Sequence, residues 1–258
     1  MTNRLQIVYH PDYLTPYYTS TAESPVRVKA IHNTLSRHFD TITPGPAMVD
    51  DILKVHELGL LYQVRNLGDA TYRTALLAAG GALAAARLAV LGWPTFAVVR
   101  PPGHHAGHRR NGRFCFFNNM AVAAAWVLET QPVERLVIVD IDMHQGDGTA
   151  EIFAADPRVR LIDVWARDRS AYLETLFDQL EQVKAADLIA VSAGFDWAVD
   201  DWGGMLTVDD FERIGTGINA FARRHTGGRF FAVLEGGYAV NSLPRAVLAF
   251  CRGLSQEG

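Results

Sequence analysis

The sequence predicts a single α/β domain in which helices cover both faces of a mostly parallel sheet. From about residue 71 onward, short apolar runs alternate with longer stretches of helical spacing. The apolar runs are continuous, as in strands buried on both faces. Polar, glycine-rich segments directly follow four of these runs, at the strand ends where ligands bind in open parallel sheets. We therefore expect a three-layer αβα domain that spans residues 1–258.

The first part of the chain carries the weaker pattern. A short strand is predicted over residues 5–8 (LQIV). Helices or helical turns are predicted over residues 25–37 and 50–66. The segment Pro44-Gly45-Pro46 separates them, because proline and glycine interrupt helices.

From residue 71 onward, predicted strands and helices alternate regularly. The strands, indicated by short continuous apolar runs, are residues 96–99, 136–139, 159–162, 188–191 and 230–234. The helices, indicated by helical spacing of apolar residues, are residues 71–91, 119–130, 170–185, 208–225 and 242–252. Such alternation is typical of a parallel sheet covered by helices.

Composition narrows the class of protein. Of the 258 residues, 49% are hydrophobic, which provides enough apolar surface to exclude a disordered chain. The net charge of −4 leaves no cationic excess for binding nucleic acid. The two cysteines, Cys115 and Cys251, fit a reducing compartment, and the first residues contain no secretory apolar segment. We expect a cytoplasmic protein.

The most apolar window, residues 75–93, has two interpretations. It contains a single charged residue, Arg87, so its length and composition are compatible with a membrane span. It consists mostly of alanine and glycine, however, which favour membranes only weakly. We therefore interpret it as a tightly packed core helix and expect no membrane partner.

Asp142 and His144 follow the predicted strand at residues 136–139. Side chains two positions apart in extended backbone point to the same side, so both can reach one cation. Asp196 follows a neighbouring predicted strand and can supply a second carboxylate. Two carboxylates and one imidazole leave a coordination position open, which is typical of a catalytic site for Zn²⁺ or Fe²⁺. The alternative is that these residues only cap strand ends.

Two adjacent histidines, His104 and His105, follow the strand at residues 96–99. On their own they are compatible with a second metal site, a structural pair or a catalytic role. Asp140 and Asp147 favour catalysis, because each can accept a hydrogen bond from one imidazole and raise its basicity. Two such dyads beside a metal are suited to moving a proton to and from water.

Tyr238 ends the segment Glu235-Gly236-Gly237-Tyr238, which follows the strand at residues 230–234. Gly236 and Gly237 allow a turn that a Cβ atom would block, and we expect them to border the substrate. A phenol on such a turn can donate a hydrogen bond to a developing oxyanion. The alternative is an ordinary packed tyrosine.

Five motifs in order resemble the histone deacetylase superfamily, which includes bacterial acetylpolyamine amidohydrolases and acetoin-utilisation-type proteins. The motifs are RPPGHHA (100–106), FCFFNN (114–119), VDIDMHQGDGT (139–149), SAGFD (192–196) and EGGY (235–238). The resemblance runs from about Tyr9 to the C-terminus. It implies an arginase/deacetylase-like fold and a zinc-dependent amide hydrolase that acts on acylated amines.

The resemblance also implies roles for individual residues. Asp142, His144 and Asp196 are similar to the zinc ligands, and Tyr238 is similar to the tyrosine that polarises the substrate carbonyl. The remaining implied roles are His104 and His105 as the active-site pair, Asp140 and Asp147 as the carboxylates behind them, and Phe114 as a wall of the substrate tunnel. A structural potassium ion is implied near Asp140, Asp142, His144 and Asp163.

The chain departs from the family pattern at two places. Arg113 stands where the family has a glycine at the substrate, which changes the expected shape of the tunnel. A long loop that follows the strand at residues 159–162 in the family is largely absent, and Asp163 replaces a serine there. We expect a wider, shallower cavity mouth, or a wall supplied by another subunit of a homo-oligomer. Trp165 either covers part of the exposed site or simply packs.

Two other functions are compatible with the same motifs. A two-metal ureohydrolase of the arginase type shares the fold, but it carries more aspartates and has no evident use for the histidine pair. A protein that binds acylated ligands with little turnover is the second alternative, favoured by the missing loop and by Arg113. Acetylated polyamines, protein lysines and small metabolites all fit the motifs.

Overall fold

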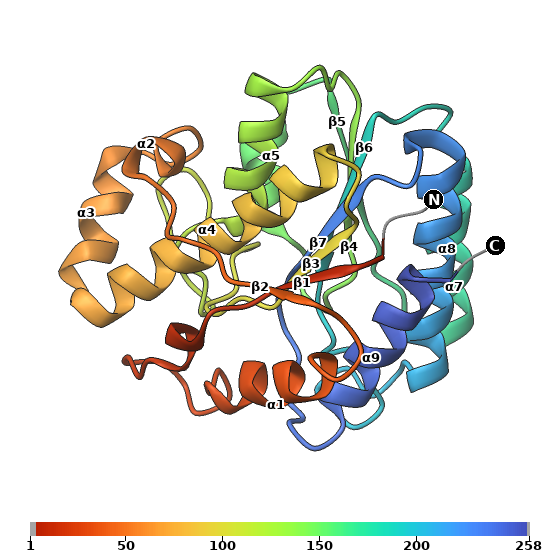
Figure 1. Ribbon diagram of the computed structural model, residues 1–258, viewed down its shortest axis with the longest axis horizontal. Coiled ribbons are helices and arrows are strands. Elements are labelled where there is room, and N and C mark those ends of the chain that lie inside the picture. Colours follow the sequence, from red (N-terminus) through yellow and green to blue (C-terminus); the bar gives the residue numbers. More distant parts are fainter. Residues whose placement is uncertain (1–3, 257–258) are drawn as a thin grey trace.

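The structure, a computed structural model, describes residues 4–256 and has three layers (Figure 1). Within these residues, seven strands form one sheet in the order β2-β1-β3-β7-β6-β4-β5, and all neighbouring strands are parallel. The strands are β1 (Gln6–Val8), β2 (Thr41–Ile42), β3 (Thr95–Ala97), β4 (Leu136–Asp140), β5 (Val159–Asp163), β6 (Leu188–Ala193) and β7 (Phe230–Leu234). The predicted αβα architecture is confirmed.

Helices cover both faces of the sheet. They are α1 (Val26–Leu35), α2 (Val49–Ile52), α3 (Leu58–Asn66), α4 (Asp69–Val90), α5 (Asn119–Thr130), α6 (Asp147–Phe153), α7 (Arg169–Glu181), α8 (Val208–Thr226) and α9 (Leu243–Leu254), with a short 3-10 helix at Pro11–Leu14. Helices α1, α7, α8 and α9 pack together on one face. Helices α4 and α5 lie on the other face, with α2, α3 and α6 against them (Figure 1).

The core lies on both sides of the central strands. Every residue of β3, β4, β6 and β7 is buried, which explains why their sequences are apolar without alternation. Strand β5 is partly exposed because it forms an edge of the sheet. The four buried strands are neighbours, so the segments that follow them emerge side by side.

Most predicted elements agree with the structure, but the helix predicted over residues 50–66 is divided. It consists of α2 and α3, and the turn between them points His56 inward, where its side chain is 4% exposed. Helix α6 was not predicted; it begins at Asp147, directly after the polar segment that follows β4. Strand β2 was also missed, because a two-residue strand has too few residues for a pattern.

The apolar window at residues 75–93 falls largely in α4. Helix α4 is long and apolar enough to cross a membrane, but 67% of its most apolar window is buried within the fold. It packs against α5, β3 and β7. These contacts agree with the interpretation as a core helix.

Gly80 of α4 allows a close approach to a neighbouring chain segment. A Cβ atom on Gly80 would lie 2.0 Å from the carbonyl oxygen of Gly45. The 44–47 segment is fixed at this place because the amide of Ala47 donates a hydrogen bond to the carbonyl of Leu76 (2.9 Å). The helix and the loop therefore meet backbone to backbone.

We predict that Gly80→Ala destabilises the protein by about 1–3 kcal/mol, because backbone atoms must move to admit the methyl group. Gly59→Ala in α3 is a matched control, since no atom lies within 4 Å of its added Cβ. The control should be neutral or gain up to about 1 kcal/mol from helix propensity. Chemical denaturation measures both, and equal midpoints for Gly80→Ala and wild type would contradict the packing described.

Candidate active site

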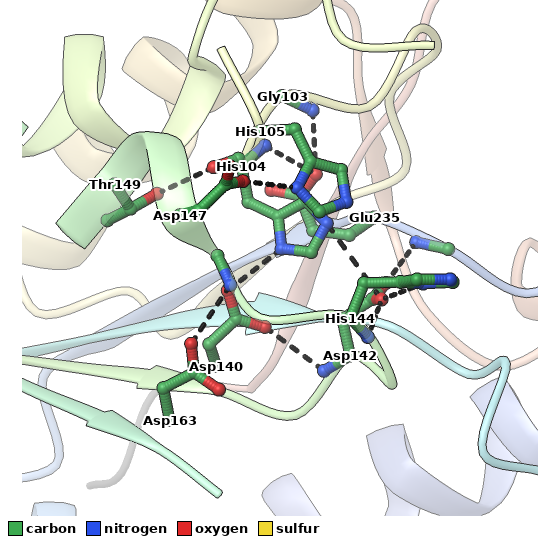
Figure 2. Close-up of polar contacts among 12 residues, drawn as sticks. Gly103, His104, His105, Asp140, Asp142, His144, Asp147, Thr149, Asp163 and Glu235 are labelled. Carbon is green, nitrogen blue, oxygen red and sulfur yellow. Dashed lines mark hydrogen bonds and ion pairs between the residues drawn. The ribbon is translucent and has the colours of Figure 1, made fainter. Parts of the chain in front are cut away.

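The predicted catalytic segments converge at the carboxyl ends of β3, β7, β6 and β4. They border a cavity of about 370 Å³. Its lining residues are Pro102, His104, His105, Arg113, Phe114, Cys115, His144, Trp202, Gly236 and Tyr238. Figure 2 shows the polar groups at its base. A larger hollow of about 1040 Å³ lies at the amino ends of the strands and contains none of the predicted catalytic residues.

Three of the predicted ligands form one cluster. Asp142, His144 and Asp196 each offer a ligand atom, and these atoms lie within 4.8 Å of one another. His144 Nδ1 is 3.2 Å from Asp142 Oδ1 and 2.9 Å from Asp196 Oδ2. Within residues 4–256, no other group of three such residues converges in this way. The donor set fits a divalent transition metal with an open coordination position.

Backbone amides hold the two carboxylates of the cluster. Gly236 donates a hydrogen bond to Asp142 Oδ2 (2.8 Å), and Met143 donates one to Asp196 Oδ1 (2.9 Å). A Cβ atom on Gly236 would lie 2.5 Å from Asp142 Oδ2, and one on Gly194 would lie 2.2 Å from it. Both glycines are therefore required for the close approach of β6 and β7 to the carboxylate.

Burial makes it costly for both carboxylates of the cluster to carry a negative charge. Asp142 and Asp196 are 2% and 0% exposed. Burial, together with the charge of Asp142, raises the pKa of Asp196 to about 7. Hydrogen bonds to both carboxylates raise the pKa of His144 to about 9. A bound cation would compensate these buried charges, and this supports the assignment of a metal site.

The structure places each histidine of the pair beside a carboxylate (Figure 2). His104 Nδ1 is 2.9 Å from Asp140 Oδ2, and His105 Nδ1 is 2.6 Å from Asp147 Oδ1. The two imidazole rings are 4.1 Å apart, and the ring of His105 is 5.9 Å from that of His144. Both histidines therefore face the cluster with their Nδ1 atoms engaged behind them.

The two imidazoles differ electrostatically. Burial opposes a charge on His104, but the carboxylates of Asp140 and Asp142 outweigh it and raise its pKa well above the ordinary value. Burial, together with the nearby charge of His104, lowers the pKa of His105 to about 4. His105 is thus the neutral member of the pair near pH 7.

Several residues that fix the histidine pair were not predicted. Glu235, 1% exposed, accepts hydrogen bonds at Oε2 from the amides of Gly103 (2.7 Å) and His104 (3.1 Å). His56 accepts a hydrogen bond at Nε2 from the amide of Asn118 (2.9 Å), so its Nδ1 donates to the carbonyl of Gly107 (2.8 Å). Glu235 opens the EGGY motif, and that position is the one sequence signal that could have identified it.

The aromatic wall of the cavity differs from the one expected. Trp202 stacks on Tyr238 with ring centroids 4.1 Å apart, and Phe114 meets Tyr238 edge to face at 5.9 Å. Trp165 is 69% exposed and is not among the lining residues, so the expected cover is supplied by Trp202 instead. Trp165 stands in the link between β5 and α7, which runs from residue 164 to residue 168.

The two glycines before Tyr238 occupy different places. Gly236 borders the cavity, whereas Gly237 lies behind it and its carbonyl accepts a hydrogen bond from the buried Arg27 guanidinium. Gly237 has φ = 114°, a conformation that a side chain disfavours. The turn predicted at these glycines is present, but only Gly236 of the two lines the cavity.

Asp163 lies beside Asp140, its neighbour in the β4–β5 register. Its Oδ2 accepts a hydrogen bond from the amide of Gly146 (2.9 Å). Burial and the charge of Asp140 raise the pKa of Asp163 to about 6. These contacts place Asp163 where the potassium site is predicted, and the ion itself stays a prediction.

Comparison with known protein families gives the same family as the motifs and the site geometry. The histone deacetylase domain model matches residues 21–178 and 169–254. The chain belongs to the histone deacetylase family. It is 33% identical to a probable deacetylase of Methanothermobacter thermautotrophicus over 97% of this chain and 91% of that protein. It is 30% identical to a histone deacetylase-like amidohydrolase of Pseudomonas aeruginosa over 93% of this chain and 78% of that protein.

A solved structure supports the arginase/deacetylase-like fold. The HDA15 HD domain superposes with a TM-score of 0.87 at 23% identity, covering 98% of this chain and 90% of that one. The histone deacetylase model matches in two pieces that overlap at residues 169–178, directly after the shortened link between β5 and α7. The alignment with the Methanothermobacter protein spans 308 positions, more than the 258 residues of this chain. This histone deacetylase family member is thus shorter within the domain.

We predict that the purified protein binds one divalent cation per chain. Asp196→Asn and His144→Ala should each weaken metal binding by more than the roughly 10- to 100-fold typical of losing a residue behind a ligand. Metal analysis after dialysis and isothermal titration calorimetry measure this. Asp147→Asn, outside the cluster, is the control and should keep wild-type stoichiometry. Two ions per chain, or full binding by Asp196→Asn, would contradict the assignment.

Proposed function

We propose that this protein is a zinc-dependent amidohydrolase that removes an acetyl or other short acyl group from an acylated amine. The observation that carries the proposal is the convergence of three elements on one cavity: the Asp142–His144–Asp196 cluster, two histidine–aspartate dyads, and the Tyr238 side chain. The relatives named deacetylase and amidohydrolase support the same reaction class. Within that class, we infer that the metal is zinc and that the substrate is an acylated amine.

Asp142, His144 and Asp196 would hold the zinc ion. Two carboxylates and one imidazole fit Zn²⁺, and Fe²⁺ would accept the same donors. When bound, such an ion polarises a carbonyl group and makes a water molecule more acidic. The remaining chemistry falls to side chains of the chain itself.

His105 is placed to move the proton. Its Nδ1 is held by Asp147, so its Nε2 is the atom available to the cavity. We infer that Nε2 takes a proton from the attacking water as the water oxygen bonds to the carbonyl carbon. The same atom then returns the proton to the amide nitrogen as the carbon–nitrogen bond breaks. The products are a carboxylic acid, which releases its proton near pH 7, and a free amine.

Asp147 also has a second partner. Its other oxygen, Oδ2, lies 3.0 Å from the Arg110 guanidinium, which in turn contacts Glu151 at 3.1 Å. These contacts fix the carboxylate and, through it, the ring of His105. His104 is held by the fully buried Asp140, and we infer that it supports the negative charge that develops on the substrate.

Tyr238 is suited to donate a hydrogen bond to the substrate oxygen. Burial raises the pKa of its phenol above the ordinary value, so the hydroxyl stays protonated. Among residues 4–256, none makes a hydrogen bond to this hydroxyl. Asp201 accepts hydrogen bonds from the amides of Tyr238 (2.5 Å) and Ala239 (2.7 Å), which fixes the turn. The phenol is thus positioned and available.

The arginase-type alternative receives less support. A two-metal centre needs a further set of carboxylates around the first cluster, but Asp140 is engaged by His104 and Asp147 by His105 and Arg110. The binding-only alternative is the one that the activity measurements below decide, because it shares the cavity and the cluster with the enzyme.

We predict that Tyr238→Phe folds and binds metal like the wild type but turns over about 10²–10³-fold more slowly, because one oxyanion donor is lost. Steady-state kinetics on an acetyl-lysine reporter measure the loss, and thermal unfolding with metal analysis supplies the control. Near-wild-type turnover would show that the phenol does not act on the substrate oxygen.

The proposed function is tested with a panel of acetylated and longer-acyl amines. We expect release of the free amine by the zinc-loaded protein, loss of activity on chelation, and recovery when zinc is restored. Binding of acylated ligands with no turnover under any metal loading would favour the binding-only alternative. Reconstitution with Fe²⁺ under anaerobic conditions compares the two metals.

A further inference from the structure

We propose that Arg113 selects acylated amines that carry a carboxylate on the amine side of the scissile amide. This inference rests on the proposed function and specifies the substrate class of the same site. It is carried by three observations: the position of Arg113 on the cavity, the absence of a partner for its guanidinium, and the backbone conformation that places it there.

Arg113 is the one arginine or lysine among the residues that line the cavity of about 370 Å³. No aspartate or glutamate is among these lining residues. Phe114 and Tyr238 line the same cavity, and Arg113 is exposed to solvent. The guanidinium therefore stands where a substrate enters, outside the base at which the acyl group would react.

The guanidinium of Arg113 has no protein partner within residues 4–256. The hydrogen bonds and ion pairs of the described chain include none from this group. Its neighbours in the same loop differ: Arg109 pairs with Glu57, and Arg110 pairs with Asp147 and Glu151. An arginine presents up to five donors in a fixed planar arrangement that matches a carboxylate. Arg113 keeps all of them available.

The backbone at Arg113 is held in an unfavourable conformation. Arg113 has φ = 48° and Phe114 has φ = 72°, both in the left-handed region that favours glycine or asparagine. Gly112 and Cys115 enclose them with reciprocal backbone hydrogen bonds of 3.0 and 2.9 Å, which makes a tight two-residue turn. Such outliers persist where the surrounding structure enforces them, often at functional sites. This turn places both side chains on the cavity.

The charge at the mouth discriminates between substrate classes. A polycationic amine would bring its other ammonium groups toward the unpaired guanidinium, which is unfavourable. A carboxylate at the same place would form charge-assisted hydrogen bonds. Asp201, the acidic residue next to Trp202, is engaged by the amides of Trp202, Tyr238 and Ala239. The lining thus favours an anionic group beyond the amide nitrogen.

The test is a matched pair of substrates, Nα-blocked Nε-acetyl-lysine with a free carboxylate and its carboxamide. For the zinc-loaded wild type we expect kcat/KM to favour the carboxylate by roughly three- to tenfold, as for a partly exposed charge-assisted pair. The preference should lie mostly in KM and should shrink as ionic strength rises. A peptide ending in acetyl-lysine distinguishes a peptide carboxyl terminus from the free amino acid as the source of the carboxylate.

Variants assign the preference to the guanidinium. Arg113→Gln should bring the carboxylate-to-carboxamide ratio close to one, and Arg113→Lys should keep part of it. Arg113→Gly removes the side chain and also relaxes the backbone, so it should lose the ratio without a lower melting temperature. Arg109→Gln, in the same loop but outside the lining, is the control and should keep the wild-type ratio.

Two outcomes would overturn the inference: equal use of both substrates by the wild type, or a preference that survives in Arg113→Gln. Failure of the proposed function is distinct, because then no acylated amine is hydrolysed at all. In that case calorimetric titration of the same two compounds into metal-loaded wild type and Arg113→Gln still decides the role of Arg113. Tighter binding of the carboxylate by the wild type alone supports it, and equal binding refutes it.

Discussion

The structure depends on burying several carboxylates at one edge of a parallel sheet. Asp140, Asp142, Asp196 and Glu235 are all at most 2% exposed, and they lie at or just after the ends of three neighbouring strands. Burying a charge is costly unless it is paired or hydrogen-bonded. Backbone amides and the His104 imidazole compensate them in part, and a cation at the cluster would supply the rest. The same buried charges therefore belong both to the site and to the ends of the strands, so the site and this edge of the sheet stabilise each other.

This constraint explains the small residues around the site. A Cβ atom on Gly146 would lie 2.3 Å from Asp140 Oδ2, and atoms on Gly194 and Gly236 would meet Asp142 Oδ2 at 2.2 and 2.5 Å. At Gly236 the amide donates a hydrogen bond to Asp142 Oδ2, and at Gly146 and Gly194 the backbone passes closer to a carboxylate than a side chain allows. The glycines at these three positions are therefore required by the close packing of the backbone against the buried carboxylates.

The sequence predicted the roles of residues that lie at or just after the end of a predicted strand. Asp142, His144 and Asp196 could be predicted together, because parallel strands bring their carboxyl ends to one edge. Glu235, directly after β7, carried the same kind of signal and was missed, whereas His56 and Trp202 could not be predicted, since their roles depend on which loops fold back over the edge. Trp165 and Trp202 are both exposed tryptophans in loops that follow strands, and only tertiary structure separates them. Similarly, Arg113 is read as a bulky substitution in sequence, and its lack of a partner is visible only in three dimensions.

The shortened link between β5 and α7 changes how the cavity wall is supported. Arg169 at the start of α7 makes two contacts with Asp210 in the first turn of α8, at 2.6 and 2.5 Å, and these join the starts of the two helices. The wall comes instead from the loop after β6, where Trp202 stacks on Tyr238. Asp201, the residue before Trp202, also holds the amides of Tyr238 and Ala239. The wall of the cavity and the residue proposed to polarise the substrate therefore share one anchor, so a substitution that displaces this loop will affect substrate fit and oxyanion stabilisation together.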